Sequence, residues 1–416
     1  MEQMEQMEQN DQRKAYWSGL LSGLLLAVLL IGCIFVGKQV FRIFEAKKIA
    51  ENAQSEDAEL LNDYTEAKID IIEDTINQYY LEEVKRSELE DGIYTGLVNA
   101  LEDPYSVYYS AEELKELQMS TEGIYYGIGA YVSKAATDDY CVISGTIENT
   151  PAEEAGLRAD DIIYMVDGVD TAGMDINEVV ALIKGEEGTK VVLMLVRDGE
   201  SDYLEIPVER RKIESPTVST EMLENDIGYI EITEFDDVTE DQFAESLAEC
   251  KAKGMKALIL DLRSNPGGNL STVCEIGRMV LPKGMIVYTE DKYGKRDEYT
   301  CDGARQLAVP TVVLVNGYSA SASEILAGAM KDHGIATIMG TTTFGKGIVQ
   351  RVISLSDGSA VKLTVSKYYT PNGNNIHEKG IEPDVVVEFD ADAYYNEGVD
   401  NQLQEAISYL SEQTVK

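Results

Sequence analysis

A run of small residues between an apolar stretch and a helical pattern constrains this chain more than any other feature. The apolar residues 311–315 predict a buried strand, Asn316 and Gly317 predict a turn, and the residues from Ser321 onward predict a helix. This order places a hydroxyl at a helix N-terminus, where free backbone N–H groups and the helix dipole favour an oxyanion. The segment therefore predicts an α/β unit that presents a nucleophile.

Three serines of the S-A-S-A-S run are candidates for this nucleophile. A helix that begins near Ser321 puts Ser323 inside its first turn and leaves Ser319 in the preceding loop, so Ser321 is the best placed. The alternative is a closely packed run whose hydroxyls only cap the helix. Spacing alone leaves both interpretations open.

The segment T-F-G-K-G-I-V-Q at 343–350 contains a candidate base. Lys346 lies between two glycines in an apolar setting, and burial favours a neutral amine that can accept a proton from a hydroxyl. If a strand follows, Gln350 shares a face with Lys346 and can hydrogen-bond its amine. The alternative is a lysine that reaches outward to solvent.

A glycine-rich turn in D-L-R-S-N-P-G-G follows another predicted buried strand. The N–H groups of Gly267 and Gly268, together with that of Ala322, could form an oxyanion hole. The alternative is that the turn only connects a strand to a helix, and that Asp261 and Arg263 form a structural pair.

Charge and composition disfavour several other functions. The chain has 35 basic and 75 acidic residues and a net charge of −40, so nucleic acid is not expected as a partner. Its five cysteines form no C-x-x-C pair, which disfavours a structural zinc site or a disulfide scaffold. The only two histidines, His333 and His377, are predicted to be surface residues without a catalytic role. The predicted chemistry needs no metal or cofactor.

An uncharged apolar segment at 15–37 is 23 residues long, roughly enough to span a bilayer as a helix. We interpret it as an uncleaved transmembrane signal-anchor. The alternative is a cleaved signal, because L-I-G-C resembles a lipoprotein cleavage box ending at Cys33. Basic residues flank both ends of the segment, so the charge rule alone leaves its orientation open.

Residues 121–210 contain an ordered set of strand, turn and helix patterns. The order G-I-G-A, P-A-E-E-A-G-L, D-D-I-I, D-G and E-V-V-A-L-I-K resembles a PDZ domain. The resemblance implies that an extended peptide adds to a strand while loop N–H groups bind its C-terminal carboxylate. Glycines let such groups converge on an anion. The implied peptide-binding residues are Gly127, Ile128, Gly129 and Ala130.

Strands alternate with helices from residue 211 to residue 389, which predicts a largely parallel sheet. Here D-L-R-S-N-P-G-G, S-A-S-A-S-E-I-L-A-G and T-F-G-K-G-x-V-Q closely resemble the carboxy-terminal processing peptidases of the serine-lysine (S41) type. The resemblance covers roughly residues 69–389 and implies export, with the N-terminus inside and the body outside. The implied site residues are Ser321 as nucleophile, Lys346 as base, Gln350 as its support, and Gly267, Ala322 and the neighbouring Gly268 as oxyanion donors.

The expected fold is multidomain, with an N-terminal transmembrane helix, a small mostly-β PDZ domain and an α/β protease core of the crotonase/ClpP-like type. A helix capped by Ser87 and Glu90 is expected near the N-terminus, and the helices at 69–100 and 400–412 are candidates for a homodimer contact. The predicted boundaries are 1–14 for a cytoplasmic tail, 15–37 for the membrane span, 38–68 for a stalk, 69–120 for a helical segment, 121–210 for the PDZ domain, 211–389 for the peptidase core and 390–416 for a C-terminal helical segment.

The expected function is that of a membrane-anchored, extracytoplasmic serine endopeptidase. Its PDZ domain would bind protein or peptide substrates at accessible C-termini, and a Ser-Lys dyad would cleave them through an acyl-enzyme. One alternative is an inactive PDZ adaptor or chaperone on a degenerate peptidase core. A second is a crotonase-type acyl-CoA enzyme, which leaves the PDZ domain and the membrane segment unexplained.

Overall fold

A computed structural model describes residues 40, 59–135 and 139–414 of the chain. The chain divides into two compact units, residues 1–92 and residues 93–416.

In the first unit, helix α2 (Asp63–Tyr79) begins after Asn62. The Asn62 side chain accepts hydrogen bonds from the backbone N–H groups of Tyr64 and Thr65, which satisfies two donors that a helix start leaves free. The predicted membrane span at 15–37 lies outside the described residues. In the described ranges, no helix has both the length and the apolar character needed to cross a bilayer.

Helix α3 (Arg86–Asn99) begins one residue before its predicted start. Ser87 therefore lies inside the helix and cannot cap it, and Glu90 accepts a hydrogen bond from Nε of Arg86 at 2.9 Å. The predicted capping box of Ser87 and Glu90 is wrong. The next helix, α4 (Ala111–Glu122), does have a capping box, formed by Ser110 and Glu113.

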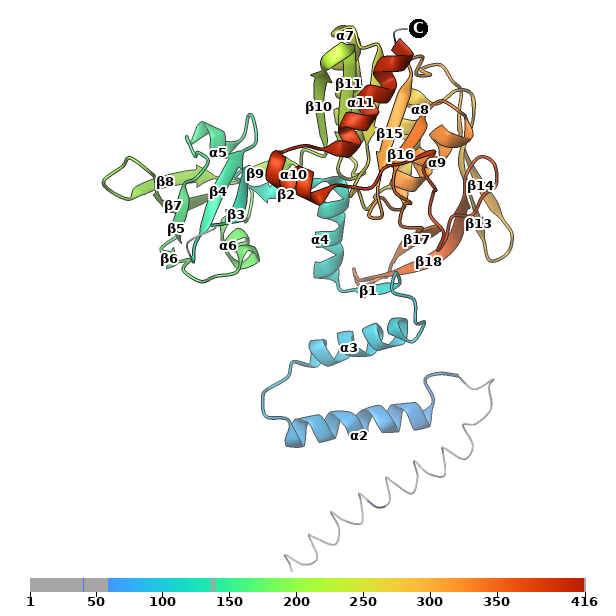
Figure 1. Cartoon of the computed structure of the whole chain (residues 1–416). Helices are drawn as coiled ribbons and strands as arrows, with labels where there is room; N and C mark the ends of the chain where they lie inside the picture. Colours follow the sequence, from blue (N-terminus) through green and yellow to red (C-terminus); the bar gives the residue numbers. More distant parts are fainter. Residues whose placement is uncertain (1–39, 41–58, 136–138, 415–416) are drawn as a thin grey trace, which may run out of the picture. The chain divides into compact units, whose positions relative to one another are not determined.

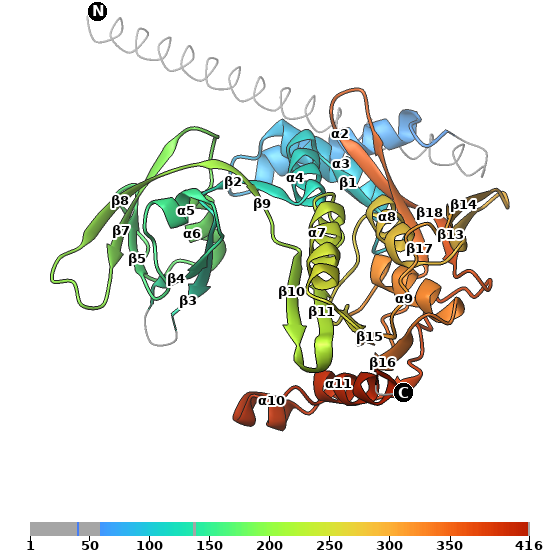
Figure 2. The same cartoon turned by 90° about the horizontal axis from the view of Figure 1, so that it is seen from above.

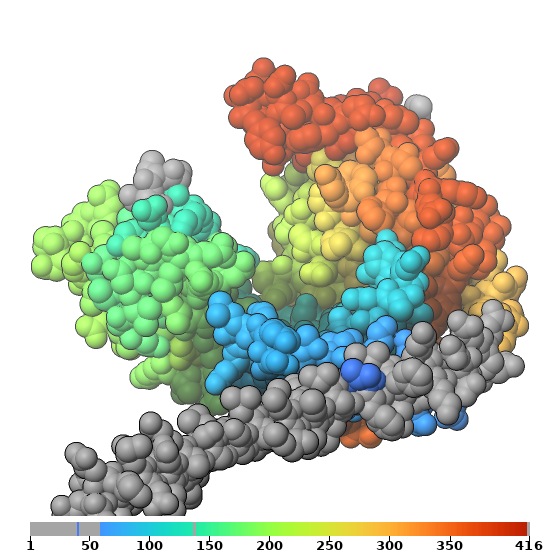
Figure 3. Space-filling view, turned by 90° about the horizontal axis from the view of Figure 1, so that it is seen from below, coloured from blue at the N-terminus to red at the C-terminus, as the bar shows by residue number. Residues whose placement is uncertain are grey.

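The small domain contains a six-stranded antiparallel sheet in the order β3-β4-β5-β7-β8, with β6 paired to β5. Alternate residues of β7, such as Val191, Leu193 and Leu195, are fully buried because successive side chains of a strand point to opposite faces. In the space-filling view the surface residues of this domain, in green, form a compact lobe (Figure 3). Its elements are β2 (Ile124–Gly127), β3 (Ala130–Lys134), β4 (Cys141–Thr146), α5 (Pro151–Glu154), β5 (Ile162–Val166), β6 (Val169–Asp170), α6 (Ile176–Ile183), β7 (Lys190–Val196), β8 (Leu204–Glu209) and β9 (Arg211–Glu214).

The larger domain is built on a six-stranded sheet in the order β10-β11-β12-β15-β16-β19 (Figure 1). The pair β10 and β11 is antiparallel, and every later pair is parallel, as the alternation of strands and helices predicts. The strands are β10 (Val218–Leu223), β11 (Ile227–Ile232), β12 (Ala257–Asp261), β15 (Thr311–Val315), β16 (Thr337–Gly340) and β19 (Val385–Val386).

Helices cover both faces of this sheet (Figure 2). Leu258 and Leu260 of β12 join one apolar cluster with α7 (Thr239–Ala252), α8 (Leu270–Val280) and α9 (Ala322–Asp332). The intervening residues Ala257 and Ile259 join another cluster with α11 (Asn401–Thr414). Burial on both faces explains why these strands read as continuous apolar runs.

The predicted C-terminal helical segment, 390–416, contains helix α11 (Asn401–Thr414), which packs on the core sheet. Ala406 and Leu410 of α11 are fully buried against the sheet. This face of the predicted dimer segment 400–412 is therefore already occupied within the chain. The short helix α10 (Ala391–Glu397) precedes α11.

A second, antiparallel sheet lies beside the helices α8 and α9. Its strand β18 (Ala360–Tyr369) pairs with β1 (Val107–Tyr109), which comes from the N-terminal side of the small domain. Sequence patterns do not predict the hairpin of β13 (Gly284–Asp291) and β14 (Arg296–Cys301), because most of the β14 side chains are polar and exposed. The remaining strand is β17 (Ile348–Ser354).

Arg263 joins the end of β12 to the residues that lead into α11. Its guanidinium lies 2.6 Å from the Asp261 carboxylate and 2.8 Å from the Asp400 carboxylate, with only 15% of the arginine side chain exposed. The structure thus contains the ion pair of Asp261 and Arg263 that the sequence offered as an alternative interpretation of this segment.

Replacing Arg263 by alanine should destabilise the larger domain, because it leaves two mostly buried carboxylates without their partner. We expect Arg263→Ala to lower the free energy of unfolding by about 3–5 kcal/mol in urea denaturation. The matched control is Lys256→Ala, which breaks an ion pair to Asp226 in which the lysine is 65% exposed. That change should cost below about 1 kcal/mol. Equal losses in the two variants would contradict a structural role for Arg263.

Candidate active site

The three serines of the S-A-S-A-S run differ in what their hydroxyls contact. Ser319 Oγ donates to the carbonyl of Leu262 at 2.8 Å, and Ser323 Oγ donates to the carbonyl of Asn265 at 3.0 Å. Both of these serines are fully buried. Among the described residues, no acceptor is recorded for the hydroxyl of half-buried Ser321. The structure therefore leaves only Ser321 of the three with a hydroxyl available for chemistry.

Ser321 is the residue immediately before helix α9 and has φ 54° and ψ −111°. Positive φ is uncommon for a residue other than glycine, and such conformations cost about 1–3 kcal/mol and cluster at functional sites. The Tyr368 hydroxyl, from β18, donates to the Ser321 carbonyl at 3.2 Å. This hydrogen bond and the start of helix α9 together hold the backbone of Ser321 in place.

Glu324 connects the predicted nucleophile to the predicted base. It is fully buried, and its Oε2 accepts the backbone N–H of Ser321 and that of Lys346, each at 2.9 Å. The two nitrogens are thus no further apart than twice this distance. Oε1 accepts the N–H of Gly345 at 2.7 Å and the hydroxyl of Thr343 at 2.6 Å. One carboxylate therefore holds both segments of the site together.

The sequence contains a signal for Glu324 that our predictions did not use. Ser-x-x-Glu at Ser321 is a capping-box pattern, in which the glutamate reaches back to the backbone of the capping residue. That pattern accounts for the bond to the Ser321 N–H. It does not predict the bonds to residues 343–346, which only the tertiary structure brings into reach.

Lys346 is half-buried, as the prediction of a base requires. Burial lowers the pKa of its amine, and the neighbouring Lys362 lowers this pKa further, whereas Asp103 and Glu324 act in the opposite direction. The Lys346 Nζ lies 4.6 Å from the centroid of the Tyr105 ring. The net lowering favours the neutral amine that a general base must be.

The flanking glycines allow the lysine loop to pack closely against a later segment. A Cβ at Gly345, which has φ +90°, would lie 2.9 Å from the backbone nitrogens of Lys379 and Gly380. A Cβ at Gly347 would lie 2.5 Å from the backbone nitrogen of His377. Residues with side chains at these positions would therefore push the Lys346 loop away from its support.

Gln350 is predicted to hydrogen-bond the lysine amine, but its amide has another partner. It lies on β17, and its Nε2 donates to Thr364 Oγ1 of β18 at 3.2 Å. Within the described part of the chain no hydrogen bond joins Gln350 to Lys346, or Lys346 Nζ to Ser321 Oγ. Catalytic hydrogen bonds are often long in structures without substrate, so Lys346 remains within the candidate site on the basis of its backbone position.

The predicted oxyanion donors lie beside the nucleophile. Gly267, with φ +108°, approaches so closely that an added Cβ would lie 2.7 Å from Ser321 Cβ and 2.9 Å from the nitrogen of Ala322. The N–H of Gly267, however, donates to Asn265 Oδ1 at 2.8 Å. In the described ranges the N–H groups of Gly268 and Ala322 have no such partner. The donors available in this conformation are thus Gly268 and Ala322.

The predicted peptide-binding loop joins β2 to β3. Ile128 and Gly129 accept backbone hydrogen bonds through their carbonyls, from Ala152 at 2.8 Å and from Ile147 at 2.9 Å. Their N–H groups have no partner among the described residues. The strand β3, which begins at Ala130, is an edge strand of its sheet and can pair with an added peptide. Gly127 ends β2 and pairs with Arg211 of β9.

Three family models match the chain: Peptidase family S41 at residues 226–387, the PDZ domain at residues 142–197, and the N-terminal domain of the activating protease CtpB at residues 28–113. The carboxy-terminal processing protease CtpA of Bacillus subtilis is 38% identical over 333 residues, which cover 78% of this chain and 71% of the relative. The chain belongs to the S41 carboxy-terminal processing proteases.

A second relative agrees with membership of the S41 family, and a solved structure has a similar fold. The carboxy-terminal processing protease CtpB of Bacillus subtilis is 37% identical over 324 residues, covering 77% of this chain and 67% of the relative. A crystal structure from Bacteroides fragilis, assigned to the S41 proteases, covers 85% of this chain and 99% of its own chain, with 17% identity and a TM-score of 0.51, and supports the fold. The predicted class of enzyme, a serine peptidase with a PDZ domain, is confirmed.

The two histidines of this S41 protease are predicted to be surface residues without a catalytic role. Both are half-buried. His333 follows the last residue of α9, and its Nε2 lies 2.7 Å from the carbonyl of Met285. His377 packs against Gly347, and its buried Nδ1 has no hydrogen-bond partner in the described ranges. Each histidine packs within the fold, and neither makes a recorded contact with Ser321.

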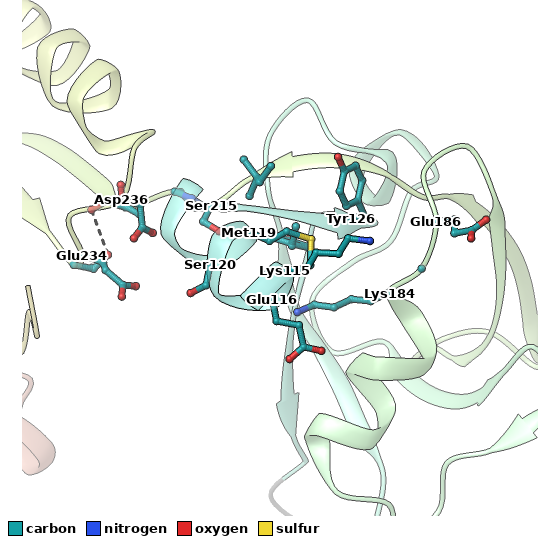
Figure 4. A pocket seen from close by; sticks show the side chains of 17 residues that line it. Lys115, Glu116, Met119, Ser120, Tyr126, Lys184, Glu186, Ser215, Glu234 and Asp236 are labelled. Carbon is teal, nitrogen blue, oxygen red and sulfur yellow. Dashed lines mark hydrogen bonds between the residues drawn. The ribbon is translucent and has the colours of Figure 1, made fainter. Parts of the chain in front are cut away.

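A cavity of about 760 Å³ lies between α4, β2, the loop after α6 and residues 233–236 (Figure 4). Burial, with the nearby Glu234 and Asp237, raises the pKa of Asp236 in its wall to about 7. The neighbouring Phe235 donates its N–H to the carbonyl of Gly267 at 2.9 Å. The segment that contributes Glu234 and Asp236 to the cavity is therefore hydrogen-bonded, through Phe235, to the glycine turn beside Ser321.

Removing the charge of Glu324 should disable the site. A glutamine amide offers one acceptor oxygen in place of two and turns N–H donors toward the N–H groups of the loop. We expect Glu324→Gln to lower kcat/KM by about 100-fold, because displacing a reacting group by about 1 Å has that effect. Steady-state cleavage of a fluorogenic peptide measures the change.

The matched control for Glu324→Gln is Glu178→Gln in the small domain. Glu178 also completes a capping box, with Asp175, but lies on an exposed helix start. We expect near-unchanged activity from this control. A similar loss in both variants would show that the effect belongs to helix capping and not to the joining of two catalytic segments.

Proposed function

We propose that this protein is a membrane-anchored, extracytoplasmic endopeptidase that cleaves proteins near their C-termini with a dyad of Ser321 and Lys346. The observation that carries the proposal is the shared carboxylate of Glu324, which holds the backbone of both residues while leaving the Ser321 hydroxyl available. Family membership supports the class of reaction, and these contacts support the choice of residues.

In the proposed reaction the neutral Lys346 amine removes the proton from the Ser321 hydroxyl as the oxygen attacks the scissile carbonyl carbon. The negative charge that develops on the carbonyl oxygen is stabilised by the N–H groups of Ala322 and Gly268, or of Gly267 once it leaves Asn265. The Lys346 ammonium then protonates the leaving amine as the peptide C–N bond breaks. Lys346, neutral again, deprotonates the water that hydrolyses the acyl-enzyme.

The small domain is proposed to bind the C-terminus of the substrate. The carboxylate of the peptide would accept hydrogen bonds from the free N–H groups of Ile128 and Gly129. The backbone of the peptide would pair with the edge strand β3. The cavity of Figure 4 is lined by β2 of this domain and by Glu234 and Asp236 of the larger domain, which suits it to take the chain that runs on from the small domain.

Membrane attachment is proposed from the uncharged residues 15–37, and the N-terminal family match begins within them at residue 28. A transmembrane signal-anchor with the N-terminus inside places the peptidase outside the cytoplasm, as its proposed role requires. A homodimer contact is proposed only for the helices at 69–100, because the other candidate face is buried on the sheet.

The dyad predicts a defined dependence on pH and on Lys346. We expect Lys346→Ala and Ser321→Ala to lower the cleavage of casein by the full-length protein by about 10³-fold or more. In the unchanged protein kcat/KM should fall as the pH falls through the pKa of Lys346, because protonation removes the base. Burial lowers this pKa, so the fall should lie at a lower pH than the usual lysine value of about 10.4.

The control for these variants is Lys292→Ala, which removes an exposed ammonium on the β13–β14 turn. Its activity should equal that of the unchanged protein. Full cleavage by Lys346→Ala would sink the dyad, and peptide binding with no cleavage by the unchanged protein would favour the adaptor interpretation.

Capture of a carboxylate predicts a preference between two otherwise identical peptides. A peptide with a free C-terminus should bind the Ser321→Ala protein roughly 10–100-fold more tightly than the same peptide amidated at its C-terminus, since charge-assisted hydrogen bonds contribute about 1.5–3 kcal/mol. Fluorescence anisotropy with labelled peptides measures both affinities. Equal affinities would rule out recognition of the C-terminus.

A further inference from the structure

The turn at residues 103–106 lies against the proposed base although it comes from outside the catalytic domain. It falls within the N-terminal family match at 28–113, and the S41 match covers only 226–387. The Tyr105 ring nonetheless faces the Lys346 amine, with 4.6 Å between Nζ and the ring centroid. A cation at this distance from an aromatic face is attracted by the ring quadrupole.

Hydrogen bonds hold this turn in one shape. The Asp103 carboxylate accepts the Tyr105 N–H at 3.1 Å and the Ser106 hydroxyl at 2.6 Å. Ser106 is buried, and its Oγ accepts the backbone N–H of Thr364 on β18 at 3.2 Å. The pairing of Val107 with Lys362 continues the attachment into β1. The turn is thus fixed to the catalytic domain on the side where the lysine lies.

Gln350 acts on the same attachment. Its Nε2 donates to Thr364 Oγ1 at 3.2 Å, and the backbone N–H of Thr364 donates to Ser106. Gln350 is therefore linked through Thr364 and Ser106 to the turn that faces Lys346. Its amide is bonded to Thr364 and makes no recorded hydrogen bond to the lysine in the described ranges. This path connects the motif T-F-G-K-G-I-V-Q to the distant D-P-Y-S.

We propose that the turn Asp103–Ser106 is a positioning element of the active site, in which the Tyr105 ring holds the Lys346 amine and stabilises its protonated form, and the Asp103 carboxylate fixes the ring in place. The inference rests on the proposed function of Lys346 as base. Tyr105 provides the one aromatic face recorded against Lys346 in the described ranges. The inference therefore makes the N-terminal segment part of the catalytic machinery.

Three charged groups besides Tyr105 act on the amine. Asp103 on the turn and Glu324 on α9 favour the ammonium, and Lys362 on β18 opposes it. Lys362 itself lies 5.3 Å from the Tyr109 ring and donates to the Tyr109 hydroxyl at 2.8 Å. Lys346 and Lys362 thus each lie against a different tyrosine of the N-terminal segment.

The test compares Tyr105→Leu with Tyr105→Phe in the full-length protein. Leucine keeps an apolar cover over the amine but removes the ring face, so the ammonium loses its attraction and the pKa of Lys346 falls. The acid limb of kcat/KM against pH should move to lower pH by about 0.5–1 unit, and kcat at the optimum should fall by about tenfold as the amine loses its orientation. Phenylalanine keeps the ring, so its profile should match that of the unchanged protein.

The matched control is Tyr293→Leu, which removes an exposed ring 5.1 Å from the Lys292 ammonium on the β13–β14 turn. It should leave both the limb and kcat unchanged. Asp103→Asn should move the limb in the same direction as Tyr105→Leu, because it removes a negative charge near the ammonium. An unmoved limb in Tyr105→Leu, with or without loss of activity, overturns the proposal, as does a shift to higher pH.

A second measurement separates this proposal from the dyad itself. NMR titration of ¹³C-methylated lysines, with the Lys346 signal assigned by its loss in Lys346→Ala, reports the amine without any need for cleavage. A lower midpoint in Tyr105→Leu supports the positioning role. Full activity in Lys346→Ala would overturn the dyad, whereas an inactive Lys346→Ala with an unmoved midpoint in Tyr105→Leu overturns only the role of the turn.

Discussion

The active site depends on one buried carboxylate. Glu324 is fully buried, and burying a charge is costly unless donors satisfy it. Three backbone N–H groups and one hydroxyl do so, and they come from both the start of α9 and the loop of Lys346. Because each segment needs Glu324 and Glu324 needs both, neither segment can move without leaving polar groups unpaired. The proposed nucleophile and the proposed base therefore behave as one unit.

The sheet of the larger domain supplies the rigid platform for this unit. β12 and β15 are buried on both faces, and their ends lead directly into the glycine turn and into the S-A-S-A-S run. The bonds of Ser319 to Leu262 and of Ser323 to Asn265 join these two connections. Gly267 can then approach the nucleophile as closely as it does because it has no Cβ. The second sheet contains β18, to which the turn at residues 103–106 is attached, and this turn places Tyr105 beside Lys346.

Sequence patterns predicted most strands and helices of the catalytic domain, because their apolar runs are long and lie between clear turns. They failed where a pattern was polar or ambiguous. The exposed β14 shows little apolar alternation, and Ser87 with Glu90 matches a capping box that an ion pair to Arg86 replaces. They also predicted a hydrogen bond from Gln350 to the lysine. A shared strand face does not show which residue of a neighbouring strand accepts from the amide, and here Thr364 of β18 does so.

The sequence by itself determined the family, the order of domains and the choice of Ser321 and Lys346 as candidates, because these follow from local motifs and their spacing. Only the tertiary structure decided which hydroxyls are already bonded, that Asn265 occupies the Gly267 N–H, and that Tyr105 faces the lysine. The physical reason is that burial and hydrogen-bond competition depend on groups far apart along the chain. A motif names the reacting side chains, and the packed neighbours set their protonation and direction.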